Sequence, residues 1–130
     1  MNINSAGFSI SKVESKVLDI IGIYRSQEGN VTDMIYKLET LIDPGKTSVI
    51  GGDLNICALA QPNNYVTASL KEMGFEQIVT RATHIEGGLI DHVYISQGEN
   101  VKFAWVLEDF PKYYSDHDGL CLTLWEVQAE

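Results

Sequence analysis

Apolar and polar residues follow two different periods along the chain, one typical of strands and the other of helices. Runs with the strand pattern are short and rich in β-branched or aromatic residues. They occupy residues 8–14, 17–24, 47–50, 75–80, 89–96, 102–106 and 120–125. In the run at 17–24 the apolar residues fall on both faces, which predicts a strand that is buried on both sides.

The segment 31–42 has helical spacing. Asn30 is suited to cap its first turn, and Asp33 interacts favourably with the positive end of the helix dipole. Asp-Pro-Gly at 43–45 ends the helix. Its apolar residues share one face: Val31, Met34, Ile35, Leu38 and Ile42.

A second helix is predicted at about 64–73. Val66, Leu70 and Met73 share one face of it, and Gly74 stands where a left-handed cap is expected. Strands outnumber helices, and the helices separate them along the chain. This order predicts a layered α/β or α+β domain with a mostly antiparallel sheet.

The composition is that of a globular domain, with 45% hydrophobic and 21% charged residues. The length of 130 residues predicts one domain that spans residues 1–130. There are 18 acidic and 9 basic side chains, a formal net charge of −9. This balance argues against a protein whose affinity for nucleic acid comes from a broad basic face.

No pattern in the sequence predicts a membrane span or a signal peptide. No apolar run reaches the roughly 18–20 residues that cross a bilayer, and the N-terminus lacks a basic segment followed by an apolar one. Cys57 and Cys121 leave one disulfide open, but the apolar run around Cys121 favours a small buried thiol. We therefore expect an intracellular protein with reduced thiols and no membrane partner.

Three short segments at strand ends carry candidate chemistry, and the first is Gly-Gly-Asp-Leu-Asn at 51–55. Asp53 and Asn55 are two residues apart, so both side chains can project to one side. A carboxylate can orient or deprotonate a water, and an amide can donate to a developing oxyanion. An Asx turn that closes a strand is the structural alternative.

The second segment is the strand at 89–96, in which Asp91 interrupts an apolar run. A carboxylate in such a place is costly to bury without a partner, which predicts a nearby cation, histidine or metal. An exposed aspartate on an edge strand is the alternative. His92 alternates to the opposite side of the strand, and we interpret it as a surface or packing residue.

The third segment is Tyr-Tyr-Ser-Asp-His-Asp-Gly at 113–119, just before the last predicted strand. Asp116 offers oxygen ligands that suit Mg²⁺. His117 can act as a proton donor or as a cationic group near phosphate. A polar turn between two strands would give the same composition.

Taken together, the segments supply a set of residues from three strand ends: Asp53, Asn55, Asp91, Asp116 and His117. These residue types make a divalent-metal phosphodiester site that needs no covalent nucleophile. Serine and cysteine nucleophile motifs, a Walker-type phosphate loop and a dinucleotide-binding fingerprint are absent from the sequence.

The three segments resemble, in the same order, signature motifs of the endonuclease/exonuclease/phosphatase superfamily. This superfamily includes apurinic/apyrimidinic endonucleases, deoxyribonuclease I and inositol polyphosphate 5-phosphatases. The matching residues are Gly-Asp-Leu-Asn at 52–55, Ile-Asp-His-Val-Tyr-Ile-Ser at 90–96 and Ser-Asp-His at 115–117. Arg-Ala-Thr-His at 81–84, followed by Gly-Gly at 87–88, is similar to the endonuclease domains of non-LTR retrotransposons.

The resemblance implies a role for each matched residue in a site that uses Mg²⁺ or Mn²⁺. Asp53 would orient or activate the attacking water, and Asn55 would help to hold the phosphate. Asp116 would contact the metal or its water shell. His117 would touch the scissile phosphate, and Asp91 would hydrogen-bond and orient His117. Four more residues are expected at the phosphate- and DNA-binding rim: Tyr24, Arg25, Thr83 and Ser115.

The resemblance covers the C-terminal portion of the family's four-layer α/β/β/α sandwich of the deoxyribonuclease I type. The family's N-terminal half carries the glutamate that is its main metal ligand, and the context of Glu14 does not match that motif. The resemblance therefore implies one sheet of the sandwich without its partner layer. Such a sheet exposes an apolar face, which predicts either self-association as a homodimer or pairing with an N-terminal half.

The leading hypothesis is a Mg²⁺-dependent endonuclease that cuts DNA by direct attack of water, nuclear if it comes from a retroelement. The missing glutamate motif favours an alternative, a non-catalytic and self-associating interaction module that keeps the fold. A phosphatase of small phosphorylated molecules from the same superfamily is a third reading.

Overall fold

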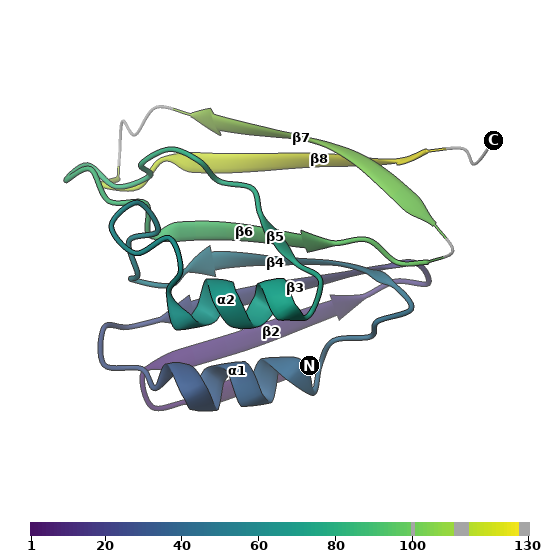
Figure 1. The fold of residues 1–130 in the computed structure, drawn as a ribbon, viewed down its shortest axis with the longest axis horizontal. Coiled ribbons are helices and arrows are strands. Elements are labelled where there is room, and N and C mark those ends of the chain that lie inside the picture. The colour runs from purple at the N-terminus through teal and green to yellow at the C-terminus, as the bar shows by residue number, and fades with distance from the viewer. Residues whose placement is uncertain (100, 111–114, 128–130) are drawn as a thin grey trace.

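The computed structural model describes residues 1–99, 101–110 and 115–127. Two helices lie along a large sheet, and the last two strands form a separate pair beside it (Figure 1). The elements in chain order are β1 (Asn2–Ser5), β2 (Phe8–Glu14), β3 (Leu18–Arg25), α1 (Val31–Glu39), β4 (Thr47–Asp53), α2 (Tyr65–Glu72), β5 (Glu76–Gln77), β6 (Asp91–Ser96), β7 (Lys102–Phe110) and β8 (Gly119–Val127).

The large sheet has six strands in the order β1-β2-β3-β4-β6-β5. Strands β3 and β4 are parallel and are connected through α1, as a parallel crossover requires. All other neighbouring pairs in this sheet are antiparallel. This arrangement confirms the predicted α/β (α+β) class with a mostly antiparallel sheet.

Both predicted helices form, and asparagine caps begin them. The side chain of Asn30 accepts a hydrogen bond from the backbone N–H of Asp33, and the side chain of Asn64 accepts one from Thr67. Helix α1 ends at Glu39 rather than at 42, although the chain continues in turns that still bury Leu41. Within the described residues, neither helix is long and apolar enough to cross a membrane.

The helices bury one face of the sheet. Their apolar stripes pack on the alternate residues of β2, β3 and β4 that point toward them. The residues at the centre of this core have no solvent exposure: Ile10, Ile21, Met34, Leu38, Ile50, Val66 and Leu70. This packing holds β4 rigidly, and β4 carries the first candidate motif at its end.

A second apolar layer covers the opposite face over β4 and β6. Strands β7 and β8 form an antiparallel pair whose inner residues pack against that face. The packed residues are Val49, Val93 and Ile95 on the large sheet and Trp105, Leu107, Leu120, Leu122 and Leu124 on the pair. The expectation of a single sheet without its partner layer was therefore wrong, because part of the second layer is built from this chain's own last two strands.

The outer face of β2 and β3 differs from the predicted burial. Ile20 and Tyr24 are each 50% exposed and Val13 is 69% exposed, so β3 is buried only on the helix side. The prediction of a strand buried on both faces was wrong because the β7–β8 pair packs over β4 and β6 instead. Cys121 also differs, since it lies exposed on β8, and both cysteines are free thiols.

Several strands have boundaries that differ from the predicted ones. Strand β4 extends through its glycines to Asp53 because β3 and β6 pair with it on both sides. The run at 75–80 shortens to Glu76–Gln77, because the side chain of Gln77 forms hydrogen bonds with the backbone of Val79 and ends the ladder. Strand β1 was not predicted at all, and β7 and β8 are both longer than expected.

Candidate active site

Asp53 and Asp91 are cross-strand neighbours at the ends of two inner strands of the large sheet, a place that we call the sheet edge. Asp53 ends β4, Asp91 begins β6, and the two residues are paired in the antiparallel register. Alternation along β6 places Asp91 on the same face as Val93 and Ile95, which is the face that β7 and β8 cover. Two carboxylates therefore lie together beside the second layer.

The backbone before Asp53 approaches β3 closely. A Cβ atom added at Gly52 would lie 1.6 Å from the carbonyl oxygen of Ile23. Only glycine fits this approach, so the Gly-Asp sequence fixes the path of the strand end as well as the acid.

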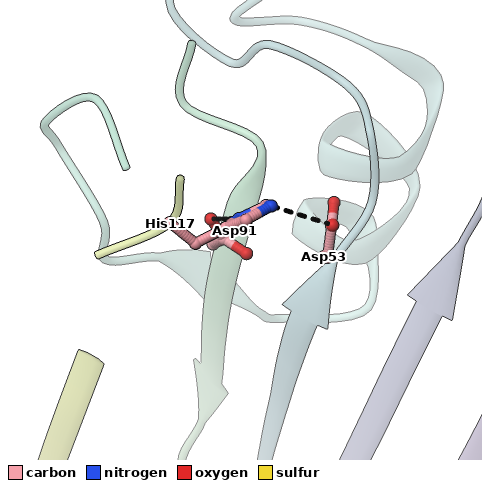
Figure 2. Close-up of side chains that lie close together, drawn as sticks. All are labelled: Asp53, Asp91 and His117. Atoms are coloured by element: carbon pink, nitrogen blue, oxygen red, sulfur yellow. Dashed lines mark hydrogen bonds and ion pairs between the residues drawn. The ribbon is translucent and has the colours of Figure 1, made fainter. Parts of the chain in front are cut away.

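His117 brings the third functional group into this corner, from the loop before β8. Its Nδ1 lies 2.7 Å from Oδ2 of Asp91 and donates a hydrogen bond to it. Its Nε2 faces Oδ2 of Asp53 across 3.7 Å. Figure 2 shows the imidazole lying between the two carboxylates. All three side chains are partly exposed, so the triad is open to a substrate.

The carboxylates favour the charged form of the imidazole. The hydrogen bond from Asp91 is the main cause that raises the pKa of His117. Partial burial opposes this shift, but the negative charges of Asp91, Asp53 and Asp116 add to it. His117 therefore presents positive charge at Nε2 over a wider pH range than a free histidine. This is the group that a phosphate oxygen would meet.

The loop after β4 is locked by hydrogen bonds between two predicted site residues. Asn55 has a φ of 52°, and its backbone N–H donates to Oδ1 of Asp53. Its side-chain amide donates to the carbonyl oxygen of Arg25 at 2.6 Å, and Arg25 donates in turn to the carbonyl of Leu54 at 2.9 Å. The structure thus shows Asn55 and Arg25 supporting the loop, with Tyr24 half exposed beside Asp53 in the strand register.

The remaining predicted site residues lie around His117 and Asp91. Thr83 is buried, and its hydroxyl accepts a hydrogen bond from the backbone N–H of Asp91. The hydroxyl of Ser115 accepts one from the backbone N–H of His117. Residues 113–114 of the same segment lie outside the described part of the chain.

Asp116 faces a residue that the sequence analysis did not select. Its Oδ2 lies 3.5 Å from Nε2 of His84. Asp116 does not belong to the close group formed by Asp53, Asp91 and His117. The only sequence signal for His84 is its place in the Thr-His segment that precedes Gly-Gly at 87–88.

His92 belongs to the core and not to the triad. It is 1% exposed, and its two ring nitrogens contact the hydroxyl of Tyr94 and the carbonyl of Ile56, each at 2.8 Å. Burial lowers the pKa of His92, and burial raises the pKa of Tyr94 to about 12. Both groups are therefore neutral near pH 7, which confirms the interpretation of His92 as a packing residue.

A groove of about 310 Å³ adjoins the triad. Its lining includes Asp91 and the two glycines at the end of β4. The complete lining is Gly51, Gly52, Asp91, His92, Val93, Asp118 and Leu120. The site is therefore reached over a surface that lies beside Asp91 and under the start of β8.

The oxygen and nitrogen atoms of the candidate site lie close enough together to surround a divalent cation. Ligand atoms of Asp53, Asp91 and His117 all lie within 4.8 Å of one another. Asp91 is committed to its hydrogen bond with His117, so the carboxylates of Asp53 and Asp116 are the ones that would hold the ion. Mg²⁺ in proteins is often held by one or two carboxylates together with substrate phosphates, and this arrangement matches that pattern.

Comparison with solved structures supports the resemblance in the sequence. The endonuclease domain of TRAS1, a telomere-specific non-LTR retrotransposon, superposes with a TM-score of 0.62 and 13% identity over 94% of this chain. The chain has an endonuclease-type fold. It spans 65% of the length of the TRAS1 domain structure.

The fold is shared more widely. A structure of beta toxin 275-280 from Staphylococcus aureus superposes with a TM-score of 0.50 and 13% identity, over 90% of this chain and 56% of the toxin chain. No protein-family model matches the sequence, and no curated protein matches it either. The likeness to these two proteins therefore lies in the fold, since only 13% of the aligned residues are identical in each case.

Proposed function

We propose that this chain carries the hydrolytic half of a divalent-metal-dependent phosphodiesterase of the endonuclease type, which acts on DNA by direct attack of water. The observation that carries the proposal is the alignment of Asp91, His117 and Asp53 at one sheet edge. An exposed turn or an isolated edge aspartate does not require this arrangement. The shared fold with an endonuclease domain supports the same chemistry.

In this mechanism His117 binds the scissile phosphate. Its Nδ1 is occupied by Asp91, so its Nε2–H is the donor directed at the substrate. The raised pKa of His117 keeps that proton in place and supplies positive charge where the pentavalent phosphate gains negative charge. Asp91 acts through His117, because it fixes the ring orientation and stabilises the imidazolium.

Asp53 prepares the water. Its Oδ1 accepts the backbone N–H of Asn55, which leaves Oδ2 facing the gap to His117. The 3.7 Å between Oδ2 and Nε2 exceeds hydrogen-bond distance, so both atoms retain capacity for substrate groups. The water oxygen attacks phosphorus and its proton passes to Asp53. The bond from phosphorus to the leaving oxygen breaks, and that oxygen takes a proton from solvent. A bound Mg²⁺ would supply positive charge for the phosphate oxygens.

The acidic balance bears on how DNA would be bound. The net charge of −9 gives the chain little long-range attraction for a polyanion. Arg25 and Arg81 are both engaged, the first with backbone carbonyls and the second with Asp109. We therefore propose weak binding to DNA by this chain, with only a shallow dependence of activity on salt concentration, because few phosphates would be neutralised by basic side chains.

Nicking of supercoiled plasmid tests the proposal. We expect Mg²⁺-dependent conversion to open circles, loss of activity with EDTA, and a fall of at least about hundredfold in His117→Ala. Asp53→Asn should lose a similar amount, because it removes the proton acceptor. Glu39→Gln, an exposed acid on α1, is the matched control and should cut like the parent chain.

Two results would overturn the assignment. One is a pure chain that leaves both plasmid and an abasic-site duplex uncut with Mg²⁺ and with Mn²⁺. The other is equal cutting by the parent chain and His117→Ala after identical purification, which would indicate a contaminating nuclease. Cleavage of p-nitrophenyl phosphate in preference to bis(p-nitrophenyl) phosphate would instead favour a phosphomonoesterase.

A further inference from the structure

The loop that carries His117 is clamped by a second segment that the mechanism above does not use. The backbone N–H of Ile85 donates to the carbonyl of Asp116, and the backbone N–H of Asp118 donates to the carbonyl of Thr83, both at 2.7 Å. Between these two hydrogen bonds, His84 and His117 face each other in an isolated antiparallel bridge. The clamp therefore places His84 directly opposite the proposed catalytic histidine.

The two imidazole rings are in contact. Their centroids lie 5.0 Å apart with an interplanar angle of 86°, so the edge of one ring meets the face of the other. Edge-to-face contact is one of the two favoured arrangements of aromatic pairs, and it restricts rotation of both rings. Asp91 holds His117 from one side through Nδ1, and His84 bounds it on another.

A backbone group sets the tautomer of His84. The N–H of Glu86 donates to Nδ1 of His84 at 3.2 Å, so the neutral ring carries its proton on Nε2. That nitrogen lies 3.5 Å from Oδ2 of Asp116. His84 thus restrains Asp116, which is otherwise a largely exposed carboxylate, beside His117.

We propose that His84 is a positioning residue that holds the ring of His117 and the carboxylate of Asp116 in one arrangement. The proposal deepens the function proposed above and rests on it for the effect on catalysis. The physical reason is that a single hydrogen bond to Asp91 leaves the ring free to tilt about that bond. The ring contact removes this freedom, and displacements of about 1 Å in an active site can lower a rate up to about hundredfold.

Three substitutions separate the two contacts of His84. His84→Ala removes both, His84→Phe keeps an aromatic ring against His117, and His84→Gln keeps a donor for Asp116. Ile85→Ala is the matched control, because this neighbouring side chain is 65% exposed and its backbone donor to Asp116 is retained. Each variant is first compared with the parent chain in thermal unfolding, so that loss of fold is recognised.

The first readout is spectroscopic and needs no activity. In nuclear magnetic resonance of the ¹⁵N-histidine-labelled chain, we expect the Nδ1 proton of His117 to exchange faster with solvent in His84→Ala. We expect slow exchange to return in His84→Phe and to stay slow in Ile85→Ala. Unchanged exchange in a folded His84→Ala would overturn the proposal, as would equal acceleration in Ile85→Ala.

The second readout is the rate of plasmid nicking. We expect His84→Ala to lower kcat by about ten- to hundredfold with little change in KM, and His84→Phe to restore a large part of kcat. A folded His84→Ala with full kcat contradicts the positioning role. If the parent chain does not cut DNA, the proposed function fails, and the exchange measurement still decides whether His84 orients His117.

Discussion

The carboxylate of Asp91 lies 2.7 Å from Nδ1 of His117, although 26 residues separate the two in the chain. Asp91 begins the inner strand β6, and His117 lies in the loop before β8. The two residues therefore come together only in the folded chain. A hydrogen bond between a carboxylate and an imidazole fixes both the direction of the ring and its proton. This relationship makes His117 more than a polar turn residue.

Asp91→Asn should therefore change His117 in a measurable way. The amide removes the negative charge and the strong acceptor, so we expect the pKa of His117 to fall toward its ordinary value of 6.5. We also expect nicking activity to drop by about ten- to hundredfold. Titration of the ring signals of His117 by nuclear magnetic resonance gives the pKa directly. An unchanged titration curve would show that the hydrogen bond is not formed in solution.

The same shift predicts how stability responds to pH. Because the folded-state pKa of His117 is raised, the protonated ring stabilises the fold fully below about pH 6.5. This contribution is lost as the pH rises through the raised value. Urea unfolding of the parent chain and of His117→Gln across that window should show a difference that shrinks as the pH rises. A constant difference at all pH values would contradict the shift.

Gly52→Ala tests the close approach that positions Asp53. The new Cβ would lie 1.6 Å from the carbonyl oxygen of Ile23. The backbone must move, so we expect a loss of about 2 kcal/mol or more in the free energy of unfolding, together with loss of nicking. Gly22→Ala on the adjacent strand is the matched control, since its added Cβ meets nothing within 4 Å. Similar losses in the two variants in urea unfolding would refute the steric explanation.

The sequence predicted the parts of this protein that depend on local pattern. Asparagine caps and helical spacing located both helices, and the order of three motifs drew attention to Asp53, Asp91 and His117 before any geometry was known. Each of these signals lies within a short stretch of chain. That Asp53, Asp91 and His117 lie together at one sheet edge was implied by the family resemblance and not by their spacing in the sequence.

Features that depend on packing between distant segments were beyond the sequence pattern. The inner residues of β7 and β8 alternate as they would in the large sheet, so nothing in them indicated a second layer. Arg25 was expected at the phosphate rim and Asn55 was expected to help hold the phosphate. The structure shows the side chains of both donating to backbone carbonyls of the loop. His84 is the last residue of the Arg-Ala-Thr-His motif at 81–84, and only the bridge to His117 shows that it lies beside the candidate site.

The buried carboxylate of Asp19 supports a different prediction. Asp19 has no solvent exposure and forms ion pairs with Lys12, at 3.5 Å, and with Lys46. Removing one member of a buried ionic group leaves its partners uncompensated, so Asp19→Asn should cost about 3 kcal/mol in the free energy of unfolding. Glu72→Gln, an exposed acid on α2, is the control and should change little. A near-neutral Asp19→Asn in urea unfolding would contradict this account.

The alkaline limit of stability checks the same cluster. Burial tends to lower the pKa of Lys12, but its contacts with Glu14 and Asp19 outweigh burial and raise it. Because the folded-state pKa is raised, the contribution of Lys12 is complete below about pH 10.5 and is lost as the pH rises through the raised value. Asp19→Asn should therefore weaken the dependence of unfolding on pH in that alkaline range.

The uncovered stripe on β2 and β3 keeps self-association as a prediction. Val13 and Ile20 are directly paired across the two strands and both are at least half exposed, with Tyr24 further along the same face. Apolar side chains grouped on an open sheet face favour contact with a second copy, although the charge of −9 opposes it. Sedimentation at moderate salt should give a mass above one chain, and Ile20→Lys should restore the single-chain mass. Leu59→Lys is the matched control, because Leu59 is 54% exposed and lies outside the stripe. A single-chain mass for the parent protein at all concentrations would rule the association out.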